Sequence, residues 1–592
     1  MNPKPIVTDT YDFPTLVGRG YVYVDKTALL HRLISGVDGT CFFLSRPRRF
    51  GKSLMLSTLA SIFNGEKKLF KGLDIARSKY DWKKYPTIRL DMSAVKARNA
   101  DEYRDVLCGV VESEARALGV ELKSIPHPGR MLDALICKLA ADGRQVVVLV
   151  DEYDAPIGGL LSNPKLLEDV RILLHDFYIT LKIRVANIRF LMMTGVSKFS
   201  KLSVFSGLNN LTDLTMRGEY AGLLGYMPEE LDRFFAPHMR EFAKARKTTP
   251  EKVKDLLLDW YDSYRFSPDS EVRVCNPVSV GRALAEKKVA SFWSATGNAT
   301  LIVERLRKAG KVPMELGAVE VSPEKLDVCD VRSLPFATLM YQGGYLTIKD
   351  VKPNGRLVLG VPNREIARSL DSGYVSDLLK DSAEDFESIA FEFRDKLESG
   401  GADAFVSMLD SVFAMVPHEW KMRNEAEAKR YFLLFMKMAG ADIAVESESA
   451  KGRADAVLVS AKAVHIFEFK YGKSARAALK QIDENGYAMP YAADRRKVVC
   501  IGLNYNARTA SFDAPLIVEA INGKVNEPVN EPVNESALLA TVRAHPGLRR
   551  PQLLKLVRIR EATMKRQLAS LAADNLIEFR GAPKNGGYYI KA

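Results

Sequence analysis

Ser45–Ser53 (SRPRRFGKS) is the stretch whose residue types and spacing point most directly to chemistry. Its last three residues match the end of the phosphate-loop pattern G-x-x-x-x-G-K-S/T, although Arg46 stands where that pattern has its first glycine. In such a loop, backbone N–H groups at a helix N-terminus bind phosphate oxygens, the lysine neutralises the β- and γ-phosphates, and the hydroxyl ligates Mg²⁺. We assign these roles to Gly51, Lys52 and Ser53; a chance match at a helix start is the alternative, which the context must exclude.

Two further apolar runs end in residues that suit nucleotide chemistry. Val146–Val150 is followed by Asp151 and Glu152, and Arg189–Met193 is followed by Thr194. An acid at the end of a neighbouring strand can hold Mg²⁺, and a following Glu can polarise the attacking water, whereas the alternative is a strand that merely ends at the surface. The expected nucleotide-contacting residues are Arg46, Arg48, Arg49, Phe50, Gly51, Lys52, Ser53 and Thr194, with Ser53 and Asp151 as metal ligands and Glu152 as catalytic base.

Five motifs in a fixed order carry a resemblance over residues 5–300. They are YVDKTALL (Tyr23–Leu30), RPRRFGKS (Arg46–Ser53), DEYDAPI (Asp151–Ile157), TGVSKFSKLSVFSGLNNLTDLT (Thr194–Thr215) and WYDSYRF (Trp260–Phe266) followed by NPVS (Asn276–Ser279). Together they resemble the AAA-ATPase-like family, whose RPRRFGK pattern includes Arg46 and whose members are frequently joined to a C-terminal nuclease-like domain. The resemblance implies a nucleotide-binding fold and ATP hydrolysis. Ser263 stands where relatives commonly show Gly.

A second candidate site lies on a predicted hairpin formed by Gly452–Val459 and Val464–Lys470. Because strand side chains alternate between faces, Glu468 and Lys470 point the same way, and Asp455 belongs to the partner strand. Two carboxylates on adjacent strands can hold Mg²⁺, while a nearby lysine orients or deprotonates water. The spacing D-x12-E-x-K fits metal-dependent phosphodiester hydrolysis; a solvated strand face with an ion pair is the alternative.

The surroundings of this hairpin carry a second resemblance. A helix with Glu425 and Glu427 precedes it, and Leu479–Ile482 (LKQI) with Tyr487 and Tyr491 follows it. Residues 421–510 thereby resemble the PD-(D/E)xK nuclease superfamily. The resemblance implies Asp455, Glu468 and Glu425 as metal ligands, Glu468, Asp455 and Lys470 as catalytic residues, and Gln481 as a supporting catalytic residue. Relatives usually show an aromatic-His pair after the helix acid, and here Ala428-Lys429 stands in its place.

The C-terminal segment holds most of the chain's net positive charge. Eleven Lys and Arg stand against three acids between Ala537 and Ala592, so this segment carries +8 of the formal +13. Asn522–Glu535, which contains VNEP twice and VNES once, is predicted to be a linker because such polar repeats bury too little apolar surface to become ordered.

The segment after the linker shows three helical patterns and then two short strands around a Gly-rich turn, an order that resembles a winged helix. The resemblance implies that the third helix lies in a DNA major groove. The expected DNA contacts are Thr563, Lys565, Arg566 and Gln567, with Arg580 and Lys584 on the wing. Protein docking is the alternative role of such a module.

The elements that must position these residues indicate an α/β multidomain protein, and 592 residues correspond to about four domains. Apolar runs alternate with helical patterns in 1–226, which predicts a P-loop NTPase-like parallel sheet. A mainly helical lid or connector follows in 227–420. We expect a PD-(D/E)xK nuclease-like α/β domain in 421–521, a linker in 522–535 and a winged-helix-like module in 536–592.

Composition excludes several classes of protein. With 47% apolar and 27% charged residues the chain is globular, and its six cysteines lie far apart, which argues for a reducing compartment and against zinc. No segment approaches the roughly 20 apolar residues of a membrane helix, so we expect a cytoplasmic protein without a membrane partner.

The sequence as a whole predicts an ATP-binding and ATP-hydrolysing protein that controls a Mg²⁺-dependent nuclease acting on DNA. ATP and Mg²⁺ are the expected cofactors and nucleic acid the expected partner, while a homo-oligomer remains an open option. The alternative is a nucleotide-dependent regulatory or nucleic-acid-binding protein without cleavage activity. Asp455, Glu468 and Lys470 favour the enzyme, because a protein that only binds has no physical need for all three.

Overall fold

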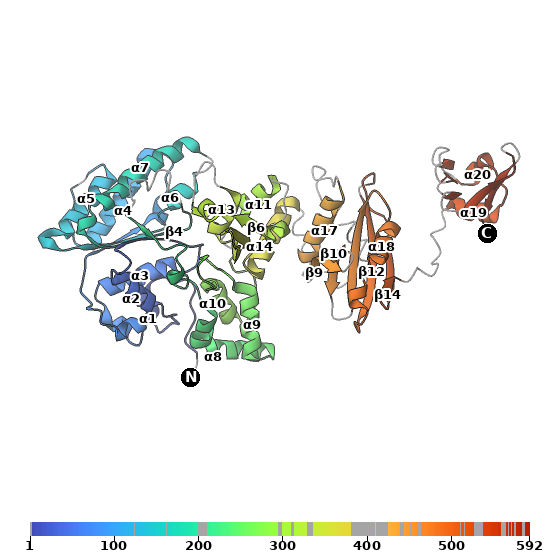
Figure 1. Cartoon of the computed structure of the whole chain (residues 1–592). Coiled ribbons are helices and arrows are strands. Elements are labelled where there is room, and N and C mark those ends of the chain that lie inside the picture. The colour runs from blue at the N-terminus through green and yellow to red at the C-terminus, as the bar shows by residue number, and fades with distance from the viewer. Residues whose placement is uncertain are drawn as a thin grey trace. The chain divides into compact units, whose positions relative to one another are not determined.

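The structure is a computed structural model that describes residues 3–591 with internal gaps. The residues outside the description are 124, 161–162, 199–209, 294–298, 309–312, 328–334, 380–408, 410–423, 439–442, 450–451, 460–462, 510, 514, 526–536, 558–563, 566–567, 570, 573–575 and 583–585. The chain divides into two compact units (Figure 1). The larger comprises Met1–Arg394, Ala414–Lys421 and Arg430–Ala441, and the smaller comprises Asp395–Phe413, Met422–Lys429 and Asp442–Ala592.

A five-stranded parallel sheet organises the larger unit. Its strands are β1 (Cys41–Ser45), β2 (Thr87–Asp91), β3 (Val146–Asp151), β4 (Ile188–Gly195) and β5 (Thr212–Asp213), in the order β2-β3-β4-β1-β5. The central strands are buried along almost their whole length, as their continuous apolar runs predict. The expected parallel sheet is therefore confirmed.

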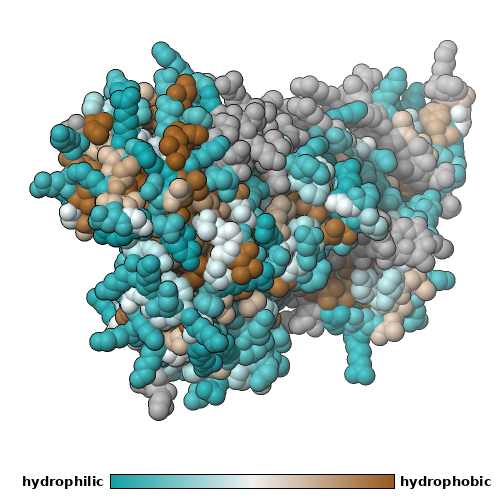
Figure 2. All heavy atoms as spheres, turned by 60° about the vertical axis from the view of Figure 1, so that its left-hand side comes forward, coloured by the Kyte–Doolittle hydropathy of each residue, from teal (hydrophilic) through white to brown (hydrophobic). Residues whose placement is uncertain are grey.

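Helices cover both faces of this sheet (Figure 1). One face carries α1 (Phe13–Gly18), α2 (Thr27–Ile34) and α3 (Lys52–Phe63), and the other carries α4 (Ala100–Ala117), α5 (Pro128–Leu139), α6 (Ala155–Gly158) and α7 (Pro164–Ile183). Buried side chains of α4, α5 and α7 form one core with those of the strands. Figure 2 shows apolar residues scattered among hydrophilic ones on the outside of this part of the chain.

The strand order corrects one expectation about the phosphate loop. We expected the strand that ends in Asp151 to neighbour the strand that precedes the loop, but β4 lies between them, pairing Cys41 with Leu191 on one side and Val147 with Phe190 on the other. Apolar periodicity identifies strands and their buried faces, but it carries no information on the order of parallel strands in a sheet. The consequence is that the end of β4 stands between the two candidate chemical groups.

The region after the sheet is helical with one small sheet. Its helices are α8 (Pro228–Arg246), α9 (Pro250–Tyr261), α10 (Pro277–Glu286), α11 (Ala299–Lys308), α12 (Pro323–Asp327), α13 (Phe336–Gly343) and α14 (Arg364–Leu379). β6 (Val319–Val321), β8 (Leu357–Gly360) and β7 (Thr347–Val351) form an antiparallel sheet in that order. Side chains of α8, α9 and α10 share a core, so the region expected to be mainly helical has the expected character with one added sheet.

The smaller unit is built on a mixed sheet with the order β15-β14-β12-β11-β10-β9, while β13 pairs with β12. Its strands are β9 (Ile443–Ser449), β10 (Gly452–Val459), β11 (Ala463–Tyr471), β12 (Lys497–Asn506), β13 (Ser511–Phe512), β14 (Leu516–Ile521) and β15 (Lys524–Val525). The predicted antiparallel hairpin is present as β10 and β11, and α18 (Ala475–Glu484) connects β11 to its parallel neighbour β12. α17 (Glu425–Met438) precedes the sheet.

The sheet extends into the segment expected to be a linker. Asn522 and Gly523 both have positive φ, at 51° and 77°, and they connect β14 to β15 in a hairpin. Asn-Gly is the residue pair that a tight two-residue hairpin turn favours, because both central positions need left-handed backbone. The sheet therefore reaches Val525, a few residues into the segment expected to be a linker.

The C-terminal segment forms a small separate core. α19 (Ala537–Ala544), α20 (Arg550–Leu556) and the antiparallel pair β16 (Ile577–Arg580) and β17 (Gly587–Ile590) surround buried apolar residues, among them Val542, Leu553, Met564 and Ile577. Most of the segment predicted to be the third helix lies outside the described residues. Among the described helices, none is both long and apolar enough to cross a membrane.

Ser263 occupies a backbone conformation that favours glycine, with φ of 81°. A non-glycine residue in this region costs about 1–2 kcal/mol. We therefore expect Ser263→Gly to raise the free energy of unfolding of the larger unit by about 1 kcal/mol, measured by chemical denaturation. As a control, Ser35→Gly, where φ is −66°, should lower it, since glycine there adds unfolded-state entropy without relieving strain. A loss of stability in Ser263→Gly would contradict the strain.

Candidate functional site

The phosphate loop connects the end of β1 to the N-terminus of α3. Gly51 precedes α3 with φ of 94°, and Arg49 also has positive φ, at 67°. A Cβ at Gly51 would meet nothing within 4 Å, so glycine is needed there for its backbone conformation and not for space. The turn brings Lys52 and Ser53 to the first turn of α3, where free N–H groups and the helix dipole favour an anion.

The ammonium of Lys52 is buried inside this loop. Its Nζ donates hydrogen bonds to the backbone oxygens of Arg46 at 2.9 Å and Pro47 at 3.0 Å. Burial lowers the pKa of Lys52, and the carboxylates of Asp154, Asp151 and Glu152 oppose that shift. In this state the lysine holds the shape of the loop, and it has to leave these carbonyls to reach a phosphate.

Arg46 turns its side chain into the interior of the protein. It is 1% exposed, its Nη1 donates to the backbone oxygens of Ser45 and Thr215, and its guanidinium lies 4.3 Å from the centre of the Phe266 ring. Nε and Nη2 have no hydrogen-bond partner among the described residues, and burial lowers the pKa of Arg46 to about 10. The position of the missing first glycine thus holds a buried guanidinium packed on an aromatic ring.

Phe50 points in the same direction as Arg46. It is 1% exposed, and its ring packs edge-on against Tyr264 at 4.9 Å and Phe266 at 5.3 Å between ring centres. Of the remaining arginines of the loop, Arg48 is exposed and Arg49 is half-buried. Two motifs noted in the sequence, RPRRFGKS and WYDSYRF, are therefore packed directly against each other.

Asp151 and Thr194 meet at the ends of adjacent strands. Thr194 Oγ1 donates to Asp151 Oδ1 at 2.7 Å. Glu152, the next residue, has φ of 48°, a strained conformation of the kind that clusters at functional sites. Burial raises the pKa of Glu152, the charge of Lys52 opposes this, and Asp151 and Asp154 add to it.

Asp154 is a buried carboxylate that the sequence analysis did not assign. It accepts backbone N–H groups from Val196 at 3.2 Å and Ser197 at 2.7 Å, and so ties the segment after β3 to the end of β4. Burial raises the pKa of Asp154, and these hydrogen bonds and Lys52 oppose the shift. Its place in DEYDAPI, three residues after Asp151, was the available signal.

Gly195 makes this connection sterically possible. A Cβ there would lie 2.5 Å from Asp154 Oδ1 and from an atom of the Tyr153 ring. We expect Gly195→Ala to destabilise the larger unit by about 1–3 kcal/mol and to weaken nucleotide binding, measured by thermal denaturation and by titration with a fluorescent ATP analogue. Gly158→Ala is the control, because nothing lies within 4 Å of a Cβ at that position. Equal stability of the two variants would contradict the role of Gly195.

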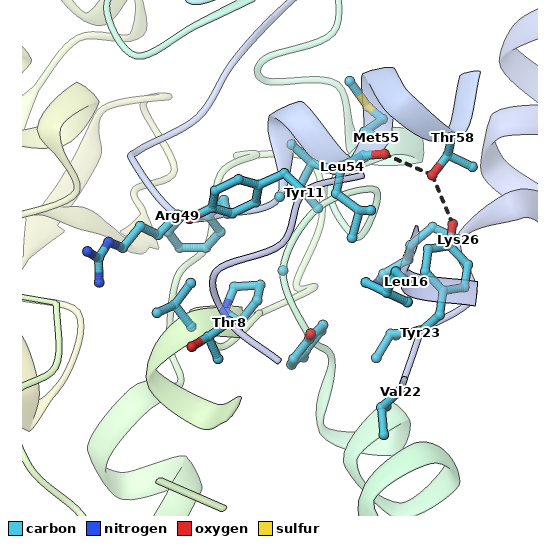
Figure 3. A pocket seen from close by; sticks show the side chains of 18 of the residues that line it. Thr8, Tyr11, Leu16, Val22, Tyr23, Lys26, Arg49, Leu54, Met55 and Thr58 are labelled. Atoms are coloured by element: carbon cyan, nitrogen blue, oxygen red, sulfur yellow. Dashed lines mark hydrogen bonds between the residues drawn. The ribbon is translucent and has the colours of Figure 1, made fainter. Parts of the chain in front are cut away.

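An apolar cavity of about 100 Å³ opens beside the phosphate loop (Figure 3). Its lining comes from the N-terminal segment, from the first turns of α3, and from residues 223–226 and 277–278; it includes Tyr11, Tyr23, Gly51, Leu54 and Tyr226. Thr58 donates to the Leu54 backbone oxygen at 2.8 Å and lies 3.5 Å from the Tyr23 hydroxyl (Figure 3). The sequence analysis missed this cavity, because its walls come from segments far apart in the chain.

The carboxylate–lysine residues of the smaller unit come together. β10 pairs Ala456 with Phe467 of β11, which places Asp455 next to Glu468. Lys470 Nζ lies 3.0 Å from Glu468 Oε1 and 3.3 Å from Glu425 Oε1 of α17. We call Glu425, Asp455, Glu468 and Lys470 the carboxylate–lysine cluster.

Burial and charge perturb this cluster. Glu468 is 1% exposed, and its Oε2 has no hydrogen-bond partner among the described residues. Burial, followed by the neighbouring charge of Asp455, raises the pKa of Glu468. Burial disfavours the charged form of Lys470, but the hydrogen bond and charge of Glu468, together with Glu425, raise its pKa above the ordinary value.

The donor chemistry of the cluster fits a hard divalent cation, since it offers carboxylate oxygens and one of them is buried without a donor. In the described residues, however, no group of three or more His, Cys, Asp or Glu side chains already has the arrangement of a metal site. One carboxylate of the cluster already has a cationic partner: Lys429 Nζ lies 2.8 Å from Asp455 Oδ1. Lys429 stands where the sequence departs from the expected aromatic-His pair, and its part in the site was not foreseen.

The remaining predicted site residues lie elsewhere in the smaller unit, and some of them are outside the described residues. Gln481 is half-buried on α18, the helix that packs on β11 and β12. Lys565 and Arg580 are exposed, and Arg580 Nε donates to Glu578 at 2.6 Å. Thr563, Arg566, Gln567 and Lys584 lie outside the described residues.

The parallel sheet, with a phosphate loop after β1 and acids after β3, defines the larger unit as a P-loop NTPase fold. Comparison with known families agrees: the family described as "Predicted AAA-ATPase" matches residues 7–205, and the "PD-(D/E)XK nuclease superfamily" matches residues 423–513. The chain therefore belongs to the predicted AAA-ATPase family and carries a C-terminal domain of the PD-(D/E)XK nuclease superfamily.

A relative from Azotobacter chroococcum mcd 1, named as an uncharacterized protein in the vnfD 5'region, is 32% identical over 515 residues, which is 85% of this chain and 96% of the relative. Two solved structures are also similar. The Aeropyrum pernix ORC2 protein, in ADPNP–ADP complexes, aligns with 12% identity over 61% of this chain and 98% of its own, with a TM-score of 0.24. Cdc6p from Pyrobaculum aerophilum aligns with 12% identity over 63% and 100%, with a TM-score of 0.25.

Proposed function

We propose that this protein binds and hydrolyses ATP with Mg²⁺ in its larger unit, and that this controls a Mg²⁺-dependent nuclease in its smaller unit that acts on DNA. The observation that carries the nuclease proposal is the convergence of two buried residues, Glu468 and Lys470, with Asp455 and Glu425 around a carboxylate oxygen that lacks a donor. A buried polar atom without a partner is costly in a structural strand and useful in a ligand site.

In the nucleotide site, the N-terminus of α3 and Lys52 would bind the β- and γ-phosphates. Ser53 and Asp151 would hold Mg²⁺, which supplies charge neutralisation of the phosphates. Thr194 would sense the γ-phosphate through its hydrogen bond to Asp151, and Glu152 would polarise the attacking water. The apolar cavity beside Gly51 would adjoin the bound nucleotide, and Arg49, which lines it, would contact the phosphates together with Arg48.

Two substitutions separate binding of ATP from its hydrolysis. We expect Lys52→Ala to abolish measurable ATP binding, because the buried loop loses its cation. Glu152→Gln should keep binding and lower the hydrolysis rate at least about 100-fold, the scale of general base catalysis. Phosphate release and a fluorescent ATP analogue report the two quantities, and Lys68→Ala, at an exposed position, is the control. Hydrolysis at the wild-type rate in Glu152→Gln would refute the assigned base.

In the nuclease site, Asp455, Glu468 and Glu425 would hold Mg²⁺, which supplies Lewis-acid activation of the phosphodiester. Lys470 would orient the attacking water and offset the charge that develops on the phosphate. The hydrogen bond and charge of Glu468 raise the pKa of Lys470, which suits an ammonium at the transition state. Gln481 would support the substrate from α18.

Cleavage tests this assignment directly. Wild-type protein should cut at least one of linear, circular and branched DNA with ATP and Mg²⁺, and Lys470→Ala should lower the rate at least about 100-fold. Lys480→Ala, on the exposed face of α18, should cleave like the wild type. If wild type and Lys470→Ala are equally inactive on every substrate, the nuclease proposal is refuted. Cleavage by Lys52→Ala at the wild-type rate would refute the control of cleavage by nucleotide.

The C-terminal module would recruit the DNA. Its support is the charge of +8, the order of helices followed by a hairpin, and the exposure of Lys565 and Arg580. In a winged helix these elements would place the third helix in the major groove and the hairpin on the backbone. Thr563, Arg566, Gln567 and Lys584 are proposed as contacts from the sequence pattern alone.

One observation favours the alternative of a regulatory or nucleic-acid-binding protein without cleavage. Lys429 lies against Asp455 as a counter-ion, which supplies part of the charge compensation that a metal would otherwise provide. DNA binding that depends on ATP, combined with no cleavage under any condition, would support this second function.

A further inference from the structure

Lys429 brings a second ammonium to the carboxylate–lysine cluster. It follows Glu425 by four residues on α17, so both side chains lie on the same face of that helix. Its Nζ is 2.8 Å from Asp455 Oδ1, and the two side chains are 18% and 16% exposed. This is a contact in a largely enclosed site, where an ion pair is screened far less than on an open surface.

The hydrogen-bond partners of the remaining carboxylate oxygens indicate which oxygens of the cluster are available to a cation. Asp455 Oδ2 accepts the backbone N–H of Phe469 at 2.8 Å, and Lys470 contacts one oxygen each of Glu468 and Glu425. Glu468 Oε2 has no donor among the described residues, although Glu468 is 1% exposed. A cation that binds this oxygen and Asp455 together meets the ammonium of Lys429 at Asp455 Oδ1.

Formal charges point the same way. Three carboxylates and two ammoniums leave the cluster at −1 when Lys429 is in place. Without Lys429 the charge is −2, which a divalent cation neutralises. Burial penalises net charge, so a cluster that holds the divalent cation is more favourable with Lys429 displaced, at 0, than with Lys429 still on Asp455, at +1.

We infer that Lys429 is a tethered counter-ion which competes with a divalent metal ion for Asp455, and that the metal binds by displacing it. The inference rests on the proposed metal-dependent site of the smaller unit. It makes Lys429 the residue that sets the metal affinity of the site: the ammonium stabilises the metal-free cluster and thereby weakens metal binding.

Titration of the full chain with Mn²⁺, followed by the electron paramagnetic resonance of free Mn²⁺ without nucleotide, measures this competition. Mn²⁺ binding that is lost in Glu468→Gln is assigned to the carboxylate–lysine cluster. We expect Lys429→Met, which keeps length and removes charge, to bind Mn²⁺ at least about tenfold more tightly than wild type. Lys429→Arg should bind as weakly as wild type. Lys480→Met, which removes an exposed lysine from the same unit, is the matched control and should change nothing.

Thermal denaturation gives an independent readout. In EDTA, Lys429→Met should melt below wild type because Asp455 loses a counter-ion, and Mn²⁺ should raise its melting temperature more than that of wild type. Lys429→Gln should behave in the same way if the methionine variant fails to fold.

Three results overturn the inference. They are equal or weaker Mn²⁺ affinity in Lys429→Met, an equal gain in Lys480→Met, and no binding that depends on Glu468 in any variant; the last also removes the proposed metal site. If Lys429→Met binds Mn²⁺ more tightly but no variant cleaves DNA, the result would support this inference and refute only the proposed nuclease activity.

Discussion

The larger unit depends on the burial of one ammonium, that of Lys52. A charge withdrawn from water has to be compensated, and at 6% exposure Lys52 obtains this from two backbone carbonyls of its own loop and from the field of Asp154, Asp151 and Glu152. The carboxylates follow β3, while the lysine follows β1. The sheet therefore has to bring the ends of these strands to one edge, and β4 between them supplies the residues that connect the two.

The phosphate loop is held from its other side by aromatic packing. Arg46 lies over Phe266, and Phe50 packs on Tyr264 and Phe266. The same segment continues into the small antiparallel sheet, because the Arg265 N–H donates to Thr347 Oγ1 at 2.7 Å. Lys52 is hydrogen-bonded to the backbone oxygen of Arg46, so the buried ammonium directly contacts the residue that packs on Phe266. The contacts thus join the nucleotide site to β7 through packed and hydrogen-bonded groups.

Residue pattern predicted the elements of this protein better than their arrangement. The apolar runs identified β3 and β4, and the alternation in β11 identified the shared face of Glu468 and Lys470, because both are consequences of local periodicity. The position of β4 between β1 and β3 was not predicted, because strand order is decided by packing between distant segments. The inward turn of Arg46 and Phe50 was not predicted for the same reason: their aromatic partners lie more than 200 residues away in the sequence. The hairpin at Asn522-Gly523 could have been predicted, because Asn-Gly favours a tight turn. The polar repeats that follow it led us to assign the whole segment to a linker instead.

The two sites compensate the charge of a buried lysine with different kinds of partner. Lys52 is hydrogen-bonded to neutral carbonyls, and an arriving phosphate brings the negative charge that the ammonium lacks, so exchange of partners improves its electrostatic environment. Lys470 and Lys429 are bonded to carboxylates, and for them an anion is a competitor of a partner already present. In the proposed sites, phosphate would therefore draw Lys52 from its carbonyls, whereas a divalent cation would take Asp455 from Lys429. One kind of buried group would thus make the larger unit responsive to an anion and the smaller unit responsive to a metal.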